Sequence, residues 1–180
     1  MKKEELILIK KSIKGNATAQ RSLYEKYKTK WFMVCLRYSR DRSEAEDMLQ
    51  EGLISIFKDM YQYDVTKGYF STWSNRVLVN AILQFIRKWK KIKYHVDVDE
   101  LKDSLSSQEE IYSNLGAKEL TQLIQKLPLG YRVVFNMYVI EGFKHKEIAA
   151  QLEISENTSK TQLYKAKRML RNQLEDILQN

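Results

Sequence analysis

Amide, hydroxyl and basic side chains gather near the C-terminus of this sequence, in residues 144–171, KHKEIAAQLEISENTSKTQLYKAKRMLR. Amide and hydroxyl groups can hydrogen-bond to base edges in the major groove of DNA, and Lys and Arg can bind phosphates. The residues with suitable side chains are Asn157, Lys160, Thr161, Tyr164, Lys165, Lys167, Arg168 and Arg171. Their spacing places them away from a single apolar stripe, so we expect a surface that binds duplex DNA.

The pattern around these residues predicts a helix-turn-helix. A short helix would carry Ile148, Ala149 and Leu152 on one face. Glu153 and Ile154 would form the turn, and Ser155 would cap the next helix. The apolar stripe of that second helix consists of Ser159, Leu163, Ala166, Leu170 and Leu174. In such a motif the start of the second helix enters the major groove. The alternative for this segment alone is a basic amphipathic helix on a protein surface.

A second candidate surface is acidic. Ser43 and Glu46 have the spacing of a capping box that opens a helix over 41–60. Its buried side would consist of Ala45, Met48, Leu49, Gly52, Leu53, Ile56, Phe57 and Met60. The acidic and amide residues of this helix fall on other faces. Because the surrounding sequence is basic, we expect this acidic face to bind a basic protein partner rather than DNA.

An aromatic loop, YQYDVTKGYFSTW over 61–73, forms a third candidate. It precedes a predicted helix from about Ser71 to Lys93. Unpaired bases stack on exposed aromatic rings, so the loop fits a single strand, and core packing is the alternative for each ring. The polar residues on neighbouring turns of the helix are Arg76, Asn80, Gln84, Arg87 and Lys88, followed by Lys90, Lys91 and Lys93.

No enzyme class fits these residues. His95 and His145 are far apart in sequence, and neither belongs to a triad or a metal-ligand cluster. We therefore expect no catalytic residue, no cofactor and no metal. His145 is interpreted as a surface or capping residue, and Cys35, on the apolar stripe of a helix, as a small buried side chain.

Composition predicts an all-α protein without a membrane span. The 180 residues include one Pro and six Gly, too few for the turns of a β-rich fold. One Cys excludes an intramolecular disulfide framework, and no apolar run approaches the ~20 residues of a membrane helix. A first helix is predicted over Lys3–Ile13 and a second from about Asn16 to Arg37. We expect a cytoplasmic protein.

The charge is unevenly distributed along the chain. Residues 1–95 carry 20 Lys/Arg and 10 Asp/Glu, residues 96–119 carry 2 and 7, and residues 120–180 carry 9 and 6. The acidic segment also lacks a sustained hydrophobic period. We therefore predict two small helical domains, 1–95 and 120–180, joined by a flexible acidic linker over 96–119. Ordinary solvation of helical surfaces is the alternative reading of this charge.

In the order and spacing of its motifs, the chain resembles a bacterial RNA polymerase sigma factor of the extracytoplasmic-function (ECF) type. The first module resembles sigma region 2 through AQRSLYEKY, AEDMLQEGLISIF and FSTWSNRVLVNAILQFIRK. The second resembles region 4 from LPLGYRVVFNMYV through EGFKHKEIAAQLEISENTSKTQLYKAKRMLR. The resemblance implies a factor that binds core RNA polymerase, directs it to promoters and assists strand opening. The alternative is a stand-alone helix-turn-helix transcription regulator.

The resemblance also implies roles for individual residues. Core polymerase would contact Glu46, Asp47, Gln50 and Glu51. The minus-ten element, including a flipped base, would contact Asp64, Thr66, Lys67, Gly68, Tyr69, Trp73, Arg76, Asn80, Arg87 and Lys88. The minus-thirty-five element would be contacted by Asn157, Thr158, Ser159, Lys160, Thr161, Gln162, Lys165 and Arg168. The implied partners are core RNA polymerase and promoter DNA, with an anti-sigma factor as a further candidate.

Two departures from the family pattern bear on promoter specificity. The family often has Val and Arg where this chain has Ser159 and Gln162. Gln can pair bidentately with adenine and Arg with guanine, so Gln162 would read a different base if it faced the groove. Ser159 is polar at a position that is usually apolar, and this change affects how the second helix packs against the rest of the domain.

Overall fold

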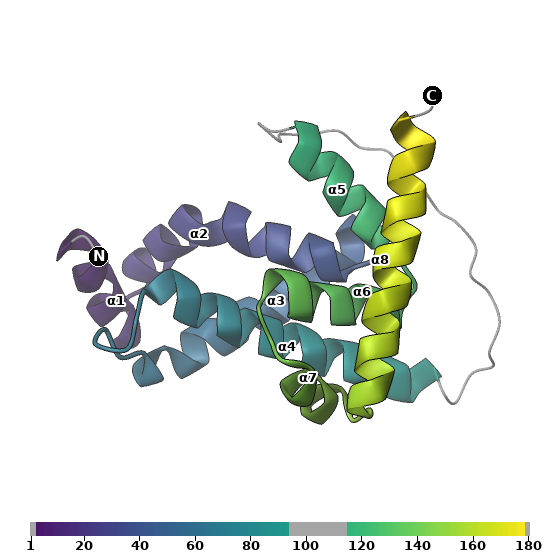
Figure 1. Ribbon diagram of the computed structural model, residues 1–180. Helices are drawn as coiled ribbons and strands as arrows, with labels where there is room; N and C mark the ends of the chain where they lie inside the picture. The colour runs from purple at the N-terminus through teal and green to yellow at the C-terminus, as the bar shows by residue number, and fades with distance from the viewer. Residues whose placement is uncertain (1–2, 94–114, 179–180) are drawn as a thin grey trace. The chain divides into compact units, whose positions relative to one another are not determined.

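A computed structural model describes residues 3–93 and 115–178, and every regular element in these ranges is helical (Figure 1). The all-α prediction is therefore confirmed. The helices are α1 Lys3–Ile13, α2 Ala17–Tyr38, α3 Arg42–Asp59, α4 Phe70–Lys93, α5 Leu115–Gln125, α6 Leu129–Phe135, α7 His145–Leu152 and α8 Glu156–Leu178, with a 3-10 turn at Met60–Gln62 and a π-helical turn at Asn136–Ile140.

The chain divides into two compact units. Among the described residues, the first consists of residues 3–35 and 42–93, and the second of residues 36–41 and 115–178. Most of the predicted linker, like His95, lies outside the described residues. The last residues of that predicted linker, 115–119, belong to α5. Among the described residues, no helix is long and apolar enough to cross a membrane.

Helix α1 ends where the sequence indicates. Gly15 has φ of +79°, a left-handed conformation that glycine adopts without a steric penalty. The Oδ1 atom of Asn16 then accepts a hydrogen bond of 2.9 Å from the backbone N–H of Ala19, which caps α2. Both features confirm the predicted break between the first two helices.

An aromatic core ties α2 to the start of α4. The rings of Tyr27 and Trp31 stack with centroids 5.3 Å apart, and Phe70 meets Tyr27 edge-on at 5.5 Å. Such ring geometries add to the stabilisation that comes from burying aromatic area. The indole N–H of Trp31 donates to the Ser74 hydroxyl at 3.2 Å, so the buried nitrogen is satisfied. Cys35 is also buried, as predicted.

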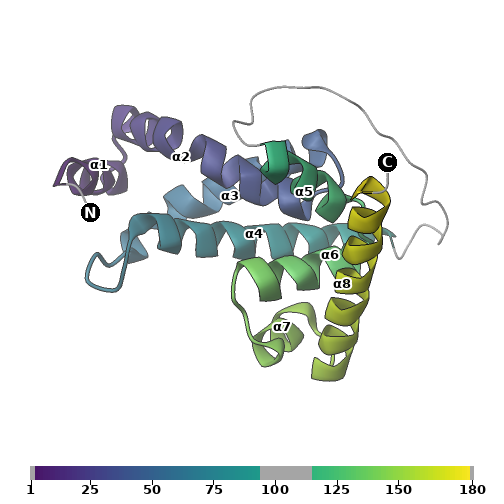
Figure 2. The ribbon, with the colours of Figure 1, turned by 45° about the horizontal axis from the view of Figure 1, so that its top comes forward.

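Helices α3 and α4 run side by side in the first unit (Figure 2). Helix α3 buries Ala45, Met48, Gly52 and Ile56, and α4 buries Leu78, Val79, Ala81, Ile82, Leu83 and Ile86. The helical period therefore leaves the acidic residues of α3 and the basic residues of α4 outside the core. Helix α3 begins at Arg42, so Ser43 lies within its first turn and not at the predicted capping position.

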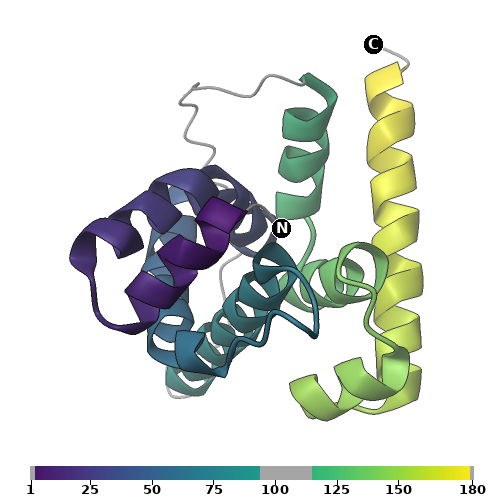
Figure 3. The same cartoon turned by 90° about the vertical axis from the view of Figure 1, so that its left-hand side faces the viewer.

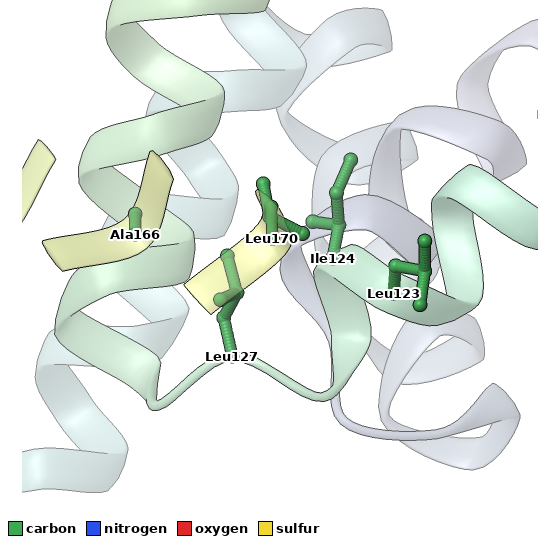
Figure 4. Close-up of a cluster of buried hydrophobic side chains, with 5 residues drawn as sticks. All are labelled: Leu123, Ile124, Leu127, Ala166 and Leu170. Carbon is green, nitrogen blue, oxygen red and sulfur yellow. The ribbon is translucent and has the colours of Figure 1, made fainter. Parts of the chain in front are cut away.

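The second unit is built around a small apolar cluster (Figure 4). It consists of Leu123, Ile124 and Leu127 from α5 and the residues after it, with Ala166 and Leu170 from α8. The predicted apolar stripe of α8 is buried from Ser159 to Leu170, whereas Leu174 is exposed. The cluster fixes which side of α8 faces inward, and therefore which side can meet a ligand.

Candidate nucleic-acid and core-binding surfaces

The acidic face of α3 is open to solvent. Its four predicted residues, Glu46, Asp47, Gln50 and Glu51, are all exposed. One of them is partly engaged, because the Glu46 carboxylate pairs with Arg42 Nε at 2.9 Å. Asp47 and Glu51 lie one turn apart and form a concentrated negative charge on one side of the helix.

Ile54 extends this acidic face with an apolar side chain that sequence reasoning missed. It is 63% exposed, although Ile is usually buried. Ile54 follows Glu51 by three residues and Gln50 by four, so it lies on the same side of α3. The signal was present in the sequence, since Ile54 falls outside the apolar period of the helix. A large apolar side chain beside charges is typical of a protein-binding surface.

The loop over residues 64–68 is closed by hydrogen bonds around Asp64. Its Oδ1 atom accepts the backbone N–H of Thr66 at 2.9 Å and the Thr66 hydroxyl at 2.7 Å, and Lys67 Nζ lies 3.8 Å from Oδ2. The Thr66 hydroxyl, its N–H and Lys67 together lower the pKa of Asp64 below its usual value. Asp64 is therefore ionised, and its first role is to shape the loop.

Tyr63 and Gly68 close the same loop from its ends. The Tyr63 hydroxyl donates to the Gly68 carbonyl at 2.9 Å. Gly68 has φ of +148°, which residues with a Cβ rarely adopt. The backbone conformation alone therefore favours glycine at position 68, whether or not this residue contacts DNA.

The aromatic side chains of this segment separate into buried and exposed rings. Phe70 is 1% exposed and belongs to the core, and Tyr63 and Trp73 pack against it with centroid distances of 5.4 and 5.6 Å. Tyr61 and Tyr69 are 69% and 65% exposed. Phe70 is therefore a core residue, whereas the rings of Tyr61 and Tyr69 are exposed and available for stacking.

Glu5 of α1 is a buried carboxylate beside Tyr27, whose ring meets Phe70 edge-on, and sequence reasoning missed it. Glu5 accepts a short hydrogen bond from the Tyr27 hydroxyl and another of 2.7 Å from Lys26 Nζ. Burial alone would raise the pKa of Glu5, but the bonds from Lys26 and Tyr27 lower it below its usual value. Burial and the Glu5 carboxylate raise the pKa of Tyr27. This network anchors α1 to α2, beside the aromatic core that supports the loop.

Helix α4 presents a row of polar side chains after the loop. Arg76, Asn80, Gln84, Arg87 and Lys88 are all exposed. Their spacing of three to four residues follows one side of the helix, while the opposite side is buried. We call this set the polar row of α4.

The helix-turn-helix of the second unit has the predicted turn and cap. Glu153 ends α7 with φ of 56°, a left-handed conformation, and the Ser155 hydroxyl accepts the backbone N–H of Thr158 at 2.9 Å. Helix α7 lies against the beginning of α8 (Figure 3). The π-helical turn before this motif, Asn136–Ile140, was not predicted from the sequence.

The exposed side of α8 contains most of the predicted DNA-binding residues. They are Asn157, Thr158, Lys160, Thr161, Lys165 and Arg168, and we call them the reading face. The Ser155 and Thr158 hydroxyls lie 2.8 Å apart, so Thr158 also contributes to the cap. The reading face combines amide and hydroxyl groups with cations, which is the chemistry needed for base edges and phosphates.

Two predicted members of this surface lie elsewhere. Ser159 is 0% exposed, and its hydroxyl lies 2.9 Å from His145 Nδ1, so its side chain is not available to DNA in this structure. Gln162 is half-buried, and its Nε2 atom would lie 3.1 Å from a Cβ placed on Gly130 of α6. The Gln162 amide is therefore turned toward α6. Both residues face the interior because they continue the stripe formed by Leu163 and Ala166.

Two sigma-factor families match the chain in the places where these surfaces lie. Sigma-70 region 2 matches residues 23–92, and sigma-70 region 4 matches residues 117–170. The first range contains the acidic face, the loop and the polar row, and the second contains the helix-turn-helix. A stand-alone helix-turn-helix regulator is not favoured, because it would leave the region 2 match unexplained.

Two curated relatives of the chain are ECF RNA polymerase sigma factors. SigW of Bacillus subtilis, an ECF RNA polymerase sigma factor, is 30% identical over 187 residues, an alignment that covers 95% of this chain and 99% of that relative. SigE of Mycolicibacterium smegmatis, also an ECF RNA polymerase sigma factor, is 28% identical over 148 residues and covers 79% of this chain and 56% of that protein.

Among solved structures, the fold is similar to that of the sigma factor RpoE from Bartonella quintana, crystallised with the anti-sigma factor NepR. The TM-score is 0.57 at 17% sequence identity, over 86% of this chain and 96% of that one. The region 2 and region 4 matches lie in the order that the sequence predicts, and together with the curated relatives they indicate a transcription initiation factor rather than an enzyme. The chain belongs to the ECF family of RNA polymerase sigma factors.

Proposed function

We propose that this sigma factor uses the acidic face of α3, with Ile54, to bind core RNA polymerase. The face is exposed on a helix whose other side is buried against α4, so it can engage a partner without unfolding the unit. Charge complementarity would select a basic surface, and Ile54 would contribute apolar area at the same place. The domain containing this site is assigned to residues 1–95.

The loop and the polar row of α4 are proposed to bind the minus-ten element. The loop backbone is already closed around Asp64, so little ordering would be needed when a base enters. Tyr69 offers an exposed ring next to Gly68, which suits stacking on an unpaired base. Arg76 and Asn80 begin the row, and Arg87 and Lys88 would bind phosphates further along.

The reading face of α8 is proposed to bind the minus-thirty-five duplex, within a domain assigned to residues 120–180. Asn157 and Thr161 could hydrogen-bond to base edges, while Lys160, Lys165 and Arg168 would bind phosphates. The linker between the two DNA-binding domains is proposed to lie within residues 96–119, before the part of that segment, residues 115–119, that belongs to α5.

The single observation that carries this proposal is the continuous exposure of the polar row of α4 beside a preformed loop. The test is transcription from a promoter library by core polymerase with and without the factor. Replacing residues 64–68 by a neutral linker, or changing Asn80 to Ala, should reduce promoter opening and alter preference at the minus-ten element. Normal opening with unchanged base preference would remove the loop and the row from this role.

The same experiment tests whether the factor acts only with polymerase. Two small DNA-binding surfaces gain effective concentration when a scaffold fixes their separation. The free chain should therefore bind a promoter weakly, and the complex with core polymerase should bind it tightly. Equal affinity of the two forms would contradict this account.

The proposed location is the cytoplasm, where bacterial RNA polymerase transcribes. An anti-sigma protein is proposed as a further partner, because ECF factors are commonly paired with one. A single-pass membrane protein encoded beside this gene would be the protein to test. If its cytosolic segment blocks binding of the factor to core polymerase, the assignment stands, and if it leaves that binding unchanged, that protein is not the partner.

A further inference from the structure

A polar pair, His145 of α7 and Ser159 of α8, lies where the apolar stripe of α8 packs against α7. Ser159 is fully buried in the first turns of α8, and the neighbours on its stripe are Leu163 and Ala166. A buried hydroxyl without a hydrogen bond is costly. In this structure His145, the first residue of α7, supplies the partner, with Nδ1 2.9 Å from Ser159 Oγ.

The His145 ring is itself fixed by a second contact. The ring of Tyr138 stacks on it with centroids 4.4 Å apart and an angle of 23° between the planes. Tyr138 belongs to the π-helical turn. The residues between this turn and α7 are held back against it, because the backbone N–H of Phe143 donates a hydrogen bond of 2.9 Å to the carbonyl of Met137. The imidazole is therefore held between the π turn on one side and α8 on the other.

Helix α7 is also fixed at the residue before His145. The backbone N–H of Lys144 donates to the Glu147 carboxylate at 2.7 Å, and the N–H of Ile148 donates to the Lys144 carbonyl at 3.0 Å. The first turn of α7 is thus well defined, so His145 presents its ring to Ser159 from a rigid position.

We propose that His145 is a positioning residue for promoter recognition, because its hydrogen bond to Ser159 fixes the rotation of α8 against α7. Asn157, Lys160 and Thr161 surround Ser159 in sequence and are exposed on the reading face. A small rotation of this turn would move all three relative to the major groove. A hydrogen bond restricts such rotation more than apolar contact does, because it has a preferred angle as well as a distance.

This inference rests on the proposed binding of the minus-thirty-five duplex by α8. It goes further by assigning a role to two residues that do not touch DNA. It also explains the departure of Ser159 from the apolar residue that is usual in the family: the hydroxyl is matched by His145, and the polar pair takes the place of an apolar contact.

The test uses the full chain assembled with core polymerase. The variants are His145→Phe, which keeps a ring against Tyr138 but removes the nitrogen, and Ser159→Ala, which removes the hydroxyl without adding volume. Each should weaken binding to the preferred minus-thirty-five duplex. The ratio of affinities for this duplex and for duplexes with one changed base pair should fall by about threefold to tenfold. Asn172→Ala, an exposed change later on α8, is the control and should leave both values unchanged.

Thermal unfolding of the same variants separates positioning from stability. A purely structural role would lower the melting temperature while preserving discrimination at temperatures where the variant is folded. Discrimination that matches the unsubstituted protein in folded Ser159→Ala would overturn the proposal, even if His145→Phe failed to fold. If Ser159→Ala discriminates less well, the double variant His145→Phe with Ser159→Val should recover part of the loss, because an apolar pair again fills the site.

Failure of the underlying function would look different. In that case the unsubstituted protein would itself show no preference for a minus-thirty-five sequence, and the inference would fall with it. A preference in the unsubstituted protein that survives both single changes would overturn only the role of His145 and Ser159.

Discussion

Gly52 of α3 lies directly against Leu78 of α4. A Cβ placed on Gly52 would come 2.1 Å from Leu78 Cδ1, closer than two carbon atoms can approach without displacement. Leu78 is fully buried, so its side chain has little room to move away. The absence of a side chain at Gly52 therefore permits the close approach of these two helices, which carry the acidic face and the polar row.

Substituting Gly52 by Ala should destabilise the first unit. Ala favours a helix intrinsically, but the clash with Leu78 requires repacking, and overpacking of this kind costs roughly 1–3 kcal/mol. The free energy of unfolding from denaturant titration measures the effect. Gly116→Ala is a matched control, since a Cβ there meets nothing within 4 Å. Adding Leu78→Ala to Gly52→Ala should remove the clash, so an equal penalty from Gly52→Ala in both backgrounds would contradict this explanation.

The sequence was sufficient to predict the helices and the helix-turn-helix because their signals are local. Gly15 with Asn16, and Ser155 before α8, act on the backbone next to them, and the structure confirms both. The π-helical turn at Asn136–Ile140 could not be predicted, because it depends on how a short segment closes against its neighbours. The capping prediction for Ser43 failed because α3 begins at Arg42, two residues before the start at Glu44 that a cap at Ser43 requires.

The candidate surfaces were predicted by residue type, but their supporting contacts were not. Helical spacing identified Asp47 and Asn80 as outward-facing, and both are exposed. The pairing of Glu5 with Tyr27 joins residues 22 positions apart, which no periodicity indicates. The family resemblance implies a DNA contact for Gln162, but its side chain lies against Gly130, and this contact depends on where α6 lies against α8.

Reversing the charge of the acidic face should weaken binding to core polymerase. The substitutions Asp47→Lys and Glu51→Lys place positive charge where a basic partner is expected, while exposed charges contribute little to folding. Affinity for core should fall by about tenfold or more, with an unchanged melting temperature. Glu25→Lys, on the exposed side of α2, is the control. Co-elution with core at unchanged affinity would remove these residues from the core-binding surface.

Ile54 should contribute to the same interface through apolar contact. Ile54→Ala removes an exposed side chain, so the free protein should lose little stability, whereas affinity for core should fall by about threefold to thirtyfold if the side chain is buried on binding. Measuring the affinity at two salt concentrations distinguishes this contribution from charge. The loss from Ile54→Ala should be nearly independent of salt, and a loss that vanishes at high salt would argue against apolar contact.

The hydroxyl of Tyr63 should matter for promoter opening through the shape of the loop. Tyr63→Phe keeps the ring against Phe70 but removes the bond to the Gly68 carbonyl, so the loop becomes less ordered before a base enters. Permanganate reactivity of unpaired thymines should fall by about twofold to tenfold, while closed-complex binding is retained. Tyr61→Phe is the matched control on an exposed ring. Equal reactivity in both variants would show that the Tyr63 hydroxyl is dispensable.

Ionised Glu5 should add to the free energy of unfolding at neutral pH, and this contribution should disappear in acid. The pKa of Glu5 is lower in the folded protein than the ordinary value of about 4.3 for an unfolded chain. Its stabilising contribution is therefore present above that value and disappears as the pH falls through the lower folded pKa. Glu5→Gln should cost about 1–2 kcal/mol at pH 7, and the difference should shrink below about pH 4. Glu25→Gln, in an exposed pair with Lys28, is the control, and a penalty from Glu5→Gln that is independent of pH would contradict the assignment.

The reading face of α8 should reveal its phosphate contacts through salt dependence. Lys160 and Arg168 are exposed cations on that face, and each phosphate contact releases condensed counterions when it forms. In the complex with core polymerase, Lys160→Ala and Arg168→Ala should each weaken binding to the upstream duplex. Each should also reduce the slope of log K against log salt by about one unit.

The phosphate contribution should be nearly independent of sequence, so the two variants should lower affinity for matched and mismatched minus-thirty-five elements by similar factors. Lys126→Ala, an exposed change after α5, should leave the slope unaltered. Thr161→Ala should behave in the opposite way, because loss of a base contact changes the preference among sequences while the salt slope stays the same. If Arg168→Ala alters base preference but not the slope, then Arg168 reads a base edge, and the phosphate assignment for that residue is wrong.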